Sequence, residues 1–214
     1  MITFKINSKL YPFPTRWEDV TYDQYMRLLH TTTLTDHIHV FTDIPRETLE
    51  NSNIKGLEKI SIALSFLSIS PQFKKTAFVG PYLMPVDCTI ESTGQFEALR
   101  GLLKNLPKDQ LSVESMEQWA DSYLGACAIY CQKLRDKKFD LDKAMKMKEE
   151  LRDYSCAEVI GTGSFFLFKP LNTSPPTMNP FLILLRHLRR WMRAFPGYQR
   201  ALNFLQRYTG QAAK

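Results

Sequence analysis

The sequence predicts a mainly α protein with a minor β component: a helical body, a small N-terminal β-hairpin and a C-terminal amphipathic helical arm. Three observations support this fold class. Apolar residues recur at helical spacing in several segments, most clearly over residues 112–135. Apolar and polar residues alternate over residues 2–6, as in a strand. The chain is 44 % hydrophobic with only 9 glycines, so it has enough apolar side chains for a folded core.

The first 30 residues predict a β-hairpin followed by a helix. Asn7-Ser8 separates two short apolar runs and predicts the turn of the hairpin. Pro12 has no N–H to donate, so the second strand is expected at an edge. Thr21 with Gln24 three residues later is the capping-box pattern, which predicts a helix starting after Thr21.

The middle of the chain predicts helices separated by one extended segment. In order, these elements are a loop or short irregular helix over 30–43, a short helix opening at Pro45, a helix over 54–67 buried nearly all round, an extended segment with turns or a short hairpin over 76–90, a helix from Ser92 or Thr93 to Lys104, a helix over 112–135, and a helix over 141–153 capped by Asp140. Phe96 and Leu99 are expected to face inward, and Gly161 and Gly163 are expected to break the chain.

Composition divides the chain into three parts. Residues 1–170 are expected to form the helical body with its hairpin. Residues 171–177 contain Asn, Thr, Ser and two prolines, which is typical of a linker. Residues 178–214 are expected to form a basic amphipathic arm, with Pro180 in the first turn of its helix.

Charge is unevenly placed along the chain. Glu158 is the last acidic residue, and the eight residues Lys169, Arg186, Arg189, Arg190, Arg193, Arg200, Arg207 and Lys214 follow it with no acidic residue between them. The 158 residues before that point carry 22 acidic against 20 basic side chains, so the net charge of +6 comes from the C-terminal quarter. Such asymmetry indicates a negatively charged partner: nucleic acid, a lipid surface or an acidic protein face.

The basic arm is therefore the candidate partner-binding site. Its apolar face consists of Leu184, Leu185, Leu188, Trp191, Met192 and Phe195, and its cationic face includes Arg186, Arg189, Arg190 and Arg193. One interpretation is a helix that packs on its own body with the arginines in water. The other is docking, because Arg binds carboxylates in bidentate fashion and aromatic anchors carry interface energy. A membrane-surface role and nucleic-acid binding also fit the charge.

No pattern predicts a catalytic, cofactor or metal site. Cys127 and Cys131 share one helix face, but they lie on its apolar stripe and are expected to be core residues. His37-Ile38-His39 suggests weak metal binding, but a solvated loop is the favoured interpretation. Gly161-Thr162-Gly163-Ser164 lacks the remainder of any phosphate-binding motif, so a hinge or helix break is expected there. The sequence therefore predicts a protein that is not an enzyme.

Two further expectations concern where the protein works. The four cysteines have no disulfide-framework spacing, which favours reduced thiols and synthesis in the cytoplasm. Apolar runs such as residues 181–185 fall far short of the roughly 20 residues that cross a bilayer, so no transmembrane segment is expected.

The stretch from Phe13 to Tyr25, which contains Trp17-Glu18-Asp19-Val20-Thr21, resembles the opening of small tail-assembly and virion proteins of tailed bacteriophages. Residues 93–97 and 163–167 are similar to such proteins from phages of Bacteroidota hosts. The resemblance implies a structural or tail-assembly role through protein–protein contacts, in multiple copies within a virion, after synthesis in the host bacterial cytoplasm. The basic C-terminal extension departs from the small chaperone-like members, which favours a component retained in the particle.

Overall fold

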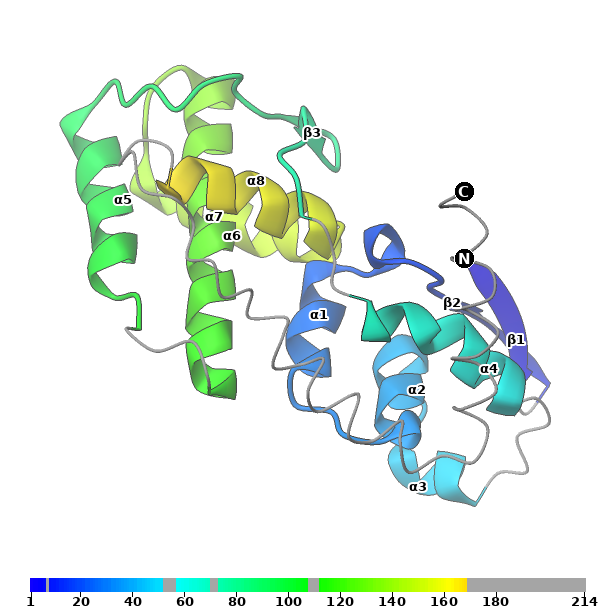
Figure 1. Cartoon of the computed structure of the whole chain (residues 1–214). Helices are drawn as coiled ribbons and strands as arrows, with labels where there is room; N and C mark the ends of the chain where they lie inside the picture. The colour runs from blue at the N-terminus through cyan, green and yellow to red at the C-terminus, as the bar shows by residue number, and fades with distance from the viewer. Residues whose placement is uncertain (7, 52–56, 70–72, 108–111, 169–214) are drawn as a thin grey trace, which may run out of the picture. The chain divides into compact units, whose positions relative to one another are not determined.

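The fold is seen in a computed structural model, which falls into two compact units (Figure 1). It describes residues 1–6, 8–51, 57–69, 73–107 and 112–168. Of these, residues 1–16 and 31–69 form unit 1, and residues 17–30 and 73–168 form unit 2. The described residues contain eight α-helices and two small antiparallel hairpins, so the predicted mainly α fold is confirmed.

Unit 1 begins with the predicted hairpin. Its strands are β1 (Ile2–Ile6) and β2 (Lys9–Phe13). Ser8 adopts a positive φ of 67° between them, as tight hairpin turns require. Phe13 is fully buried, and its ring meets the ring of Phe41 edge-on, with the centroids 6.2 Å apart. One face of the hairpin is therefore part of the core of unit 1.

Helix α2 (Leu34–Thr42) lies where a loop or irregular helix was expected. Thr33 Oγ1 accepts a hydrogen bond from the N–H of Asp36 at 3.1 Å, and the Asp36 carboxylate accepts one from the N–H of Thr33 at 3.0 Å. This reciprocal capping box satisfies backbone donors that a helix start otherwise leaves unpaired. The expectation of irregular structure is wrong because the polar, threonine-rich composition is the cap of a regular helix.

Two more helices complete the described part of unit 1. Helix α3 (Arg46–Glu50) follows Pro45 as predicted, and α4 (Leu57–Ala63) tightens into the 3₁₀ helix η2 (Leu64–Ser68). One stripe of this segment is buried: Ile60, Leu64 and Leu67. The side chain of Ile62 is exposed on the other side, so the expectation of a helix buried nearly all round is wrong at that position.

Unit 2 is built around the long helix α6 (Val113–Asp136), which the sequence predicts over 112–135. Helices α5 (Thr93–Lys104), α7 (Leu141–Glu150) and α8 (Cys156–Phe168) all contact α6. Figure 1 shows α8 crossing α6, with α5 to one side. The central turns of α6 are buried, as expected for a helix that neighbours surround.

Residues 17–30 are fastened to the chain just before α8. Residues 17–30 contain the 3₁₀ helix η1 (Trp17–Asp19) and helix α1 (Tyr22–Leu28). The segment that they contact follows the 3₁₀ helix η3 (Leu151–Asp153). The N–H of Tyr22 donates to the Tyr154 carbonyl at 2.8 Å, and the N–H of Cys156 donates to the Val20 carbonyl at 2.8 Å. Segments far apart in the sequence thus share a short antiparallel bridge.

Side-chain caps start the helices of unit 2 where the sequence predicts them. Thr21 and Gln24 form the expected capping box, with hydrogen bonds of 3.2 and 3.1 Å. Ser92 caps α5, and Asp140 caps α7. The inward face of α5 differs from the prediction: Leu99 is buried as expected, but Phe96 is 48 % exposed. The packed stripe instead includes Gln95, one turn before Leu99.

Helix α8 runs without interruption through Gly161 and Gly163, where a chain break was expected. A Cβ on Gly161 would lie 2.3 Å from the Lys74 carbonyl oxygen, and one on Gly163 would lie 2.1 Å from the Tyr123 carbonyl oxygen. No side chain fits at such distances, so the two glycines let α8 pack directly on neighbouring backbone. The expectation of a break is wrong because tertiary packing outweighs the roughly 1 kcal/mol helix cost of each glycine.

Gly163→Ala tests this close packing. The new methyl group would meet the backbone of α6, which cannot move aside like a flexible side chain. We expect the free energy of unfolding to fall by about 1–3 kcal/mol or more. Gly101→Ala in α5 is the control, because nothing lies within 4 Å of its Cβ position, and it should stabilise by about 0.5–1 kcal/mol. Urea denaturation measures both variants, and equal effects would contradict the packing role.

Candidate functional site

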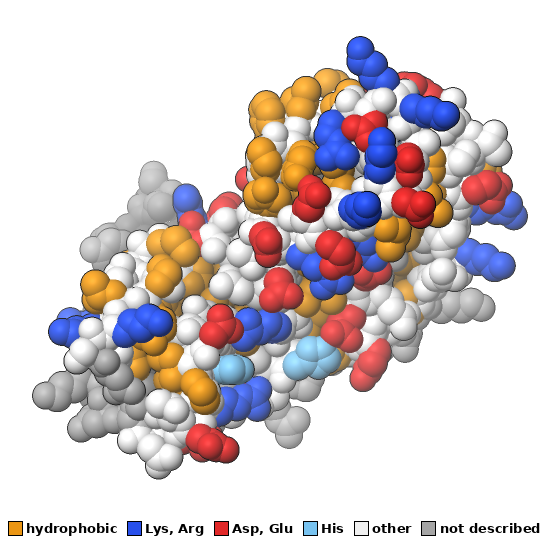
Figure 2. Space-filling model, turned by 180° about the vertical axis from the view of Figure 1, so that it is seen from behind, with side chains coloured by type: hydrophobic (Ala, Val, Ile, Leu, Met, Phe, Trp, Pro, Cys, Tyr) orange, Lys and Arg blue, Asp and Glu red, His pale blue; other side chains and the backbone are white. Residues whose placement is uncertain are grey.

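An exposed apolar surface lies on the second hairpin, in unit 2. Strands β3 (Phe78–Val79) and β4 (Tyr82–Leu83) pair antiparallel, with Phe78 opposite Leu83. Both side chains are 53 % exposed, and Val86, which follows β4, is 88 % exposed. We call Phe78, Leu83 and Val86 the hairpin surface. Figure 2 shows hydrophobic side chains gathered on part of one face, beside side chains of both charges.

The turn of this hairpin is anchored to the helices beneath it. Gly80 has a positive φ of 55°, and a Cβ there would lie 2.2 Å from the ring of Tyr154. The Gly80 N–H donates to Glu158 Oε2 at 3.0 Å. The Tyr82 hydroxyl donates to Glu150 Oε2, and this hydrogen bond raises the pKa of Tyr82 to about 12. Glycine is required at this position, because a side chain would strike the aromatic ring.

The base of the hairpin is fixed by a pair of threonines. The Thr76 hydroxyl donates to the Phe78 carbonyl at 2.6 Å. The Thr76 N–H donates to Thr162 Oγ1 on α8 at 3.1 Å, and the Thr162 side chain is fully buried. The backbone next to the exposed Phe78 is therefore tied to a core residue.

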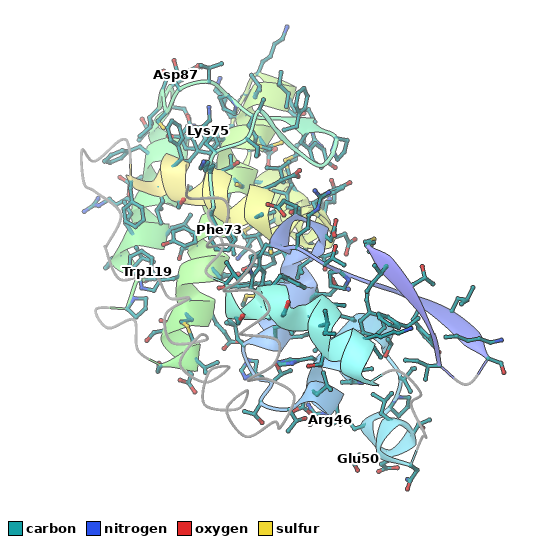
Figure 3. The ribbon with its side chains drawn as sticks, turned by 45° about the vertical axis from the view of Figure 1, so that its right-hand side comes forward. Arg46, Glu50, Phe73, Lys75, Asp87 and Trp119 are labelled. Atoms are coloured by element: carbon teal, nitrogen blue, oxygen red, sulfur yellow. The ribbon has the colours of Figure 1, made fainter. Side chains whose placement is uncertain are left out.

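The loop after β4 is held by Lys75. Its Nζ donates to the Val86 carbonyl at 2.8 Å and lies 4.8 Å from the ring centroid of Phe165 on α8. A cation above an aromatic ring is stabilised by the negative face of that ring. In Figure 3, Lys75 and Asp87 lie on the same side of α8. The ammonium group thus fastens the backbone of Val86 while leaving its side chain exposed.

This arrangement presents apolar side chains on a fixed backbone. A preorganised surface loses little conformational entropy when a partner binds, and aromatic anchors are typical of protein interfaces. The carboxylates of Glu150 and Glu158 border the hairpin, so a partner with apolar and cationic side chains suits it. The sequence predicts the extended segment over 76–90 but does not single out Phe78 and Leu83. The interpretation of this segment as a short hairpin is confirmed, with Gly80-Pro81 between the paired strands.

The cysteines of α6 are core residues, as predicted. The side chains of Cys127 and Cys131 are buried, and Cys127 Sγ lies 3.2 Å from the Val159 carbonyl oxygen. Burial raises the pKa of Cys131 to about 12 and raises the pKa of Cys127 well above its ordinary value. These thiols are therefore protonated at neutral pH, a form that is a poor nucleophile and a poor metal ligand.

His37 and His39 lie on helix α2, not on a solvated loop. His37 is only 2 % exposed, and His39 Nδ1 lies 2.8 Å from the Ile44 carbonyl oxygen. Asp36, next to them, caps the helix and pairs with Arg46 at 3.0 Å. Two residues apart on a helix, the histidines point in different directions. Within the described residues, no group of three or more His, Cys, Asp or Glu side chains is arranged to hold a metal ion.

Unit 2 also contains an ionic cluster along the first half of α6. His30 Nε2 lies 2.6 Å from Glu117 Oε1, and Lys148 Nζ lies 2.8 Å from Asp121. The buried hydroxyl of Tyr22 lies near these carboxylates, and burial raises the pKa of Tyr22 above its ordinary range. The Lys148–Asp121 ion pair joins α7 to α6, and the His30–Glu117 contact joins the segment after α1 to α6, so the cluster has a structural role in the described geometry.

The predicted partner-binding residues of the arm lie outside the described residues. They are Leu184, Leu185, Arg186, Leu188, Arg189, Arg190, Trp191, Met192, Arg193 and Phe195. The predicted linker over 171–177 also lies outside them. Their roles stay predictions from the sequence.

No family model, curated protein or solved structure matches this chain in three separate comparisons. Among the helices of the described residues, none is both long and apolar enough to span a bilayer.

The buried His37 predicts a specific pH dependence of stability. Burial lowers the pKa of His37 to about 4, against roughly 6.5 in an unfolded chain. Between these values the unfolded state binds the proton and the folded state does not, so stability falls as pH drops from about 6.5 to about 4. The loss should be on the order of 3 kcal/mol.

His37→Gln should remove this part of the pH dependence, measured by urea denaturation at several pH values. His39→Gln on the same helix is the control and should retain it, because His37 is unchanged. If the curves of the wild type and His37→Gln remain parallel between pH 4 and 6.5, the assignment to His37 is wrong.

Proposed function

We propose that this protein is a non-enzymatic structural or tail-assembly protein of a phage particle, which acts in multiple copies through protein–protein contacts. The observation that carries the proposal is the hairpin surface of Phe78, Leu83 and Val86, whose side chains are exposed while its backbone is anchored. Exposed apolar groups at a rigid site favour binding of a protein partner, since their burial against it releases water.

The composition of the arm supplies a second contact. Its apolar residues include Trp191 and Phe195, and its arginines have no acidic neighbours in the sequence. We propose that the apolar side chains fill a groove on another protein and that the arginines pair with carboxylates at its rim. Arginine suits this role because its planar guanidinium forms two hydrogen bonds to one carboxylate.

The phage context comes from the resemblance of residues 13–25. In the structure, the distinctive residues of this stretch are structural: Phe13 and Trp17 are buried, and Thr21 with Gln24 caps α1. A motif of core and cap residues supports similarity of fold. Localisation to a virion and contacts with other virion or assembly proteins are parts of the same proposal.

Nucleic-acid binding is the second candidate function, because the eight basic residues after Glu158 have no acidic counterpart. Phosphate contacts would depend steeply on salt, with a log–log slope of about −0.7 to −0.9 per contacted phosphate. Docking in a protein groove would depend mainly on the apolar side chains.

Deletion of residues 178–214 tests the arm. We expect the full chain to self-associate, and the mass in solution to fall after deletion and in Trp191→Ala or Leu188→Ala. Replacing Arg186, Arg189, Arg190 and Arg193 by Gln should have a smaller effect on mass. Binding to a duplex DNA oligonucleotide is titrated in parallel at several salt concentrations. A mass in solution that the deletion leaves unchanged contradicts arm docking, and DNA binding that the Gln variants abolish favours the alternative function.

The hairpin surface has its own test, the double variant Phe78→Ser/Leu83→Ser. Because both side chains are exposed, stability should change by no more than about 0.5 kcal/mol each. Self-association measured by sedimentation velocity should weaken about 10–100-fold, as for interface anchors. Phe96→Ser is the matched control, since Phe96 is similarly exposed on α5. An equal loss in the control would mean a general effect of surface hydrophobicity, and no loss in the double variant would contradict the proposed contact.

A further inference from the structure

The first hairpin has two unequal edges. Among the described residues, β1 and β2 form a two-stranded sheet, so each strand has an outer edge. The strands pair from Ile6 opposite Lys9 to Ile2 opposite Phe13, so two residues of the sequence connect the strands. In such a hairpin the pair flanking the turn is hydrogen-bonded, and bonded and non-bonded pairs then alternate.

This alternation determines which backbone groups point outward. The pairs Lys5–Leu10 and Thr3–Pro12 are the non-bonded ones, so the C=O groups of these four residues, and the N–H groups of all but Pro12, face the outer edges. Pro12 fits this register, because it has no N–H and its position needs no hydrogen bond between β1 and β2. The outer edge of β2 therefore lacks the donor at Pro12, while β1 retains those of both Thr3 and Lys5.

We infer that the outer edge of β1 pairs antiparallel with β1 of a second copy of this chain, forming a continuous four-stranded sheet across a two-fold axis at Phe4. The inference rests on the proposed function in one respect, since it names a second copy as one of the protein partners. An isologous contact of this kind requires a surface that complements itself.

The residues of β1 meet this requirement. In the pairing centred on Phe4, Thr3 lies opposite Lys5 of the second copy, so the outward donors and acceptors of both residues find partners. Ile2 lies opposite Ile6, and Phe4 lies opposite Phe4, so the remaining pairs are apolar, which favours strand pairing. A pairing centred on Lys5 would instead place two ammonium groups opposite each other, which is destabilising.

The blocked edge of β2 determines how far the sheet grows. If both outer edges of the hairpin kept all their N–H donors, pairing could continue from copy to copy. Because Pro12 interrupts the β2 edge, pairing at β1 alone gives a closed dimer rather than an open filament. Leu10 on that edge is 65 % exposed and lies opposite Lys5, which makes it a matched position for a control.

Proline substitution in the full chain tests the edge. Lys5→Pro removes an outward N–H of β1, and the hairpin should tolerate it as it tolerates Pro12, since both positions are non-bonded. We expect the dissociation constant of the dimer, measured by sedimentation equilibrium, to rise at least tenfold. Leu10→Pro removes the corresponding donor of β2 and should leave the constant unchanged. Thermal unfolding followed by circular dichroism checks that both variants fold.

Cysteine cross-linking tests the register without proline. Thr3→Cys and Lys5→Cys are made separately in a Cys88→Ser background, because the other three cysteines are buried with raised pKa values. Under mild oxidation, a mixture of the two variants should form covalent dimers more readily than either variant alone. Leu10→Cys should not cross-link.

Four outcomes would overturn the inference: a monomeric full chain, a dimer insensitive to Lys5→Pro, cross-linking at Leu10→Cys instead, or dimerisation only after removal of residues 178–214. The last outcome would mean that the chain's own C-terminal residues cover the edge. The tests of the hairpin surface and of the arm use other variants, so failure of the edge inference is distinguishable from failure of the proposed function.

Discussion

The direct packing of α8 against neighbouring backbone is the constraint on which most of unit 2 depends. Gly163 meets the backbone of α6 at Tyr123, and Gly161 meets the backbone of Lys74. Because α8 lies this close, three of its side chains reach the segment that carries the second hairpin. Glu158 accepts from Gly80, Thr162 accepts from Thr76, and Phe165 lies under the Lys75 ammonium. The two glycines in the core thus allow the close packing of α8 that holds the hairpin surface in place.

Many of the titratable and polar side chains among the described residues have structural roles. Buried thiols are protonated, Asp121 on α6 pairs with Lys148 on α7, and polar residues at helix starts serve as caps. The described residues also include exposed apolar side chains on an anchored backbone and a strand edge whose N–H groups at Thr3 and Lys5 point outward. Both features support the proposal of contacts between proteins.

The predictions that failed have a common physical origin. Residues 30–43 have a loop-like composition, yet Thr33 and Asp36 use their polar groups to start a regular helix. Gly161 and Gly163 have the composition of a break, yet they occur where a helix needs no side chain. Phe96 fits an apolar stripe, but the packed face of α5 includes Gln95. In each case the local sequence pattern is compatible with more than one local structure, and the tertiary contacts of the residue determine which structure forms.

The sequence by itself determined the helical class, the N-terminal hairpin, the capped starts of α1, α5 and α7, and the core position of Cys127 and Cys131. These follow from interactions within a few residues and from burial of one apolar stripe. Only the tertiary structure decided the continuity of α8, the burial of His37 and the exposure of Phe78 and Leu83. Those depend on contacts between residues distant in the sequence, which no local spacing encodes.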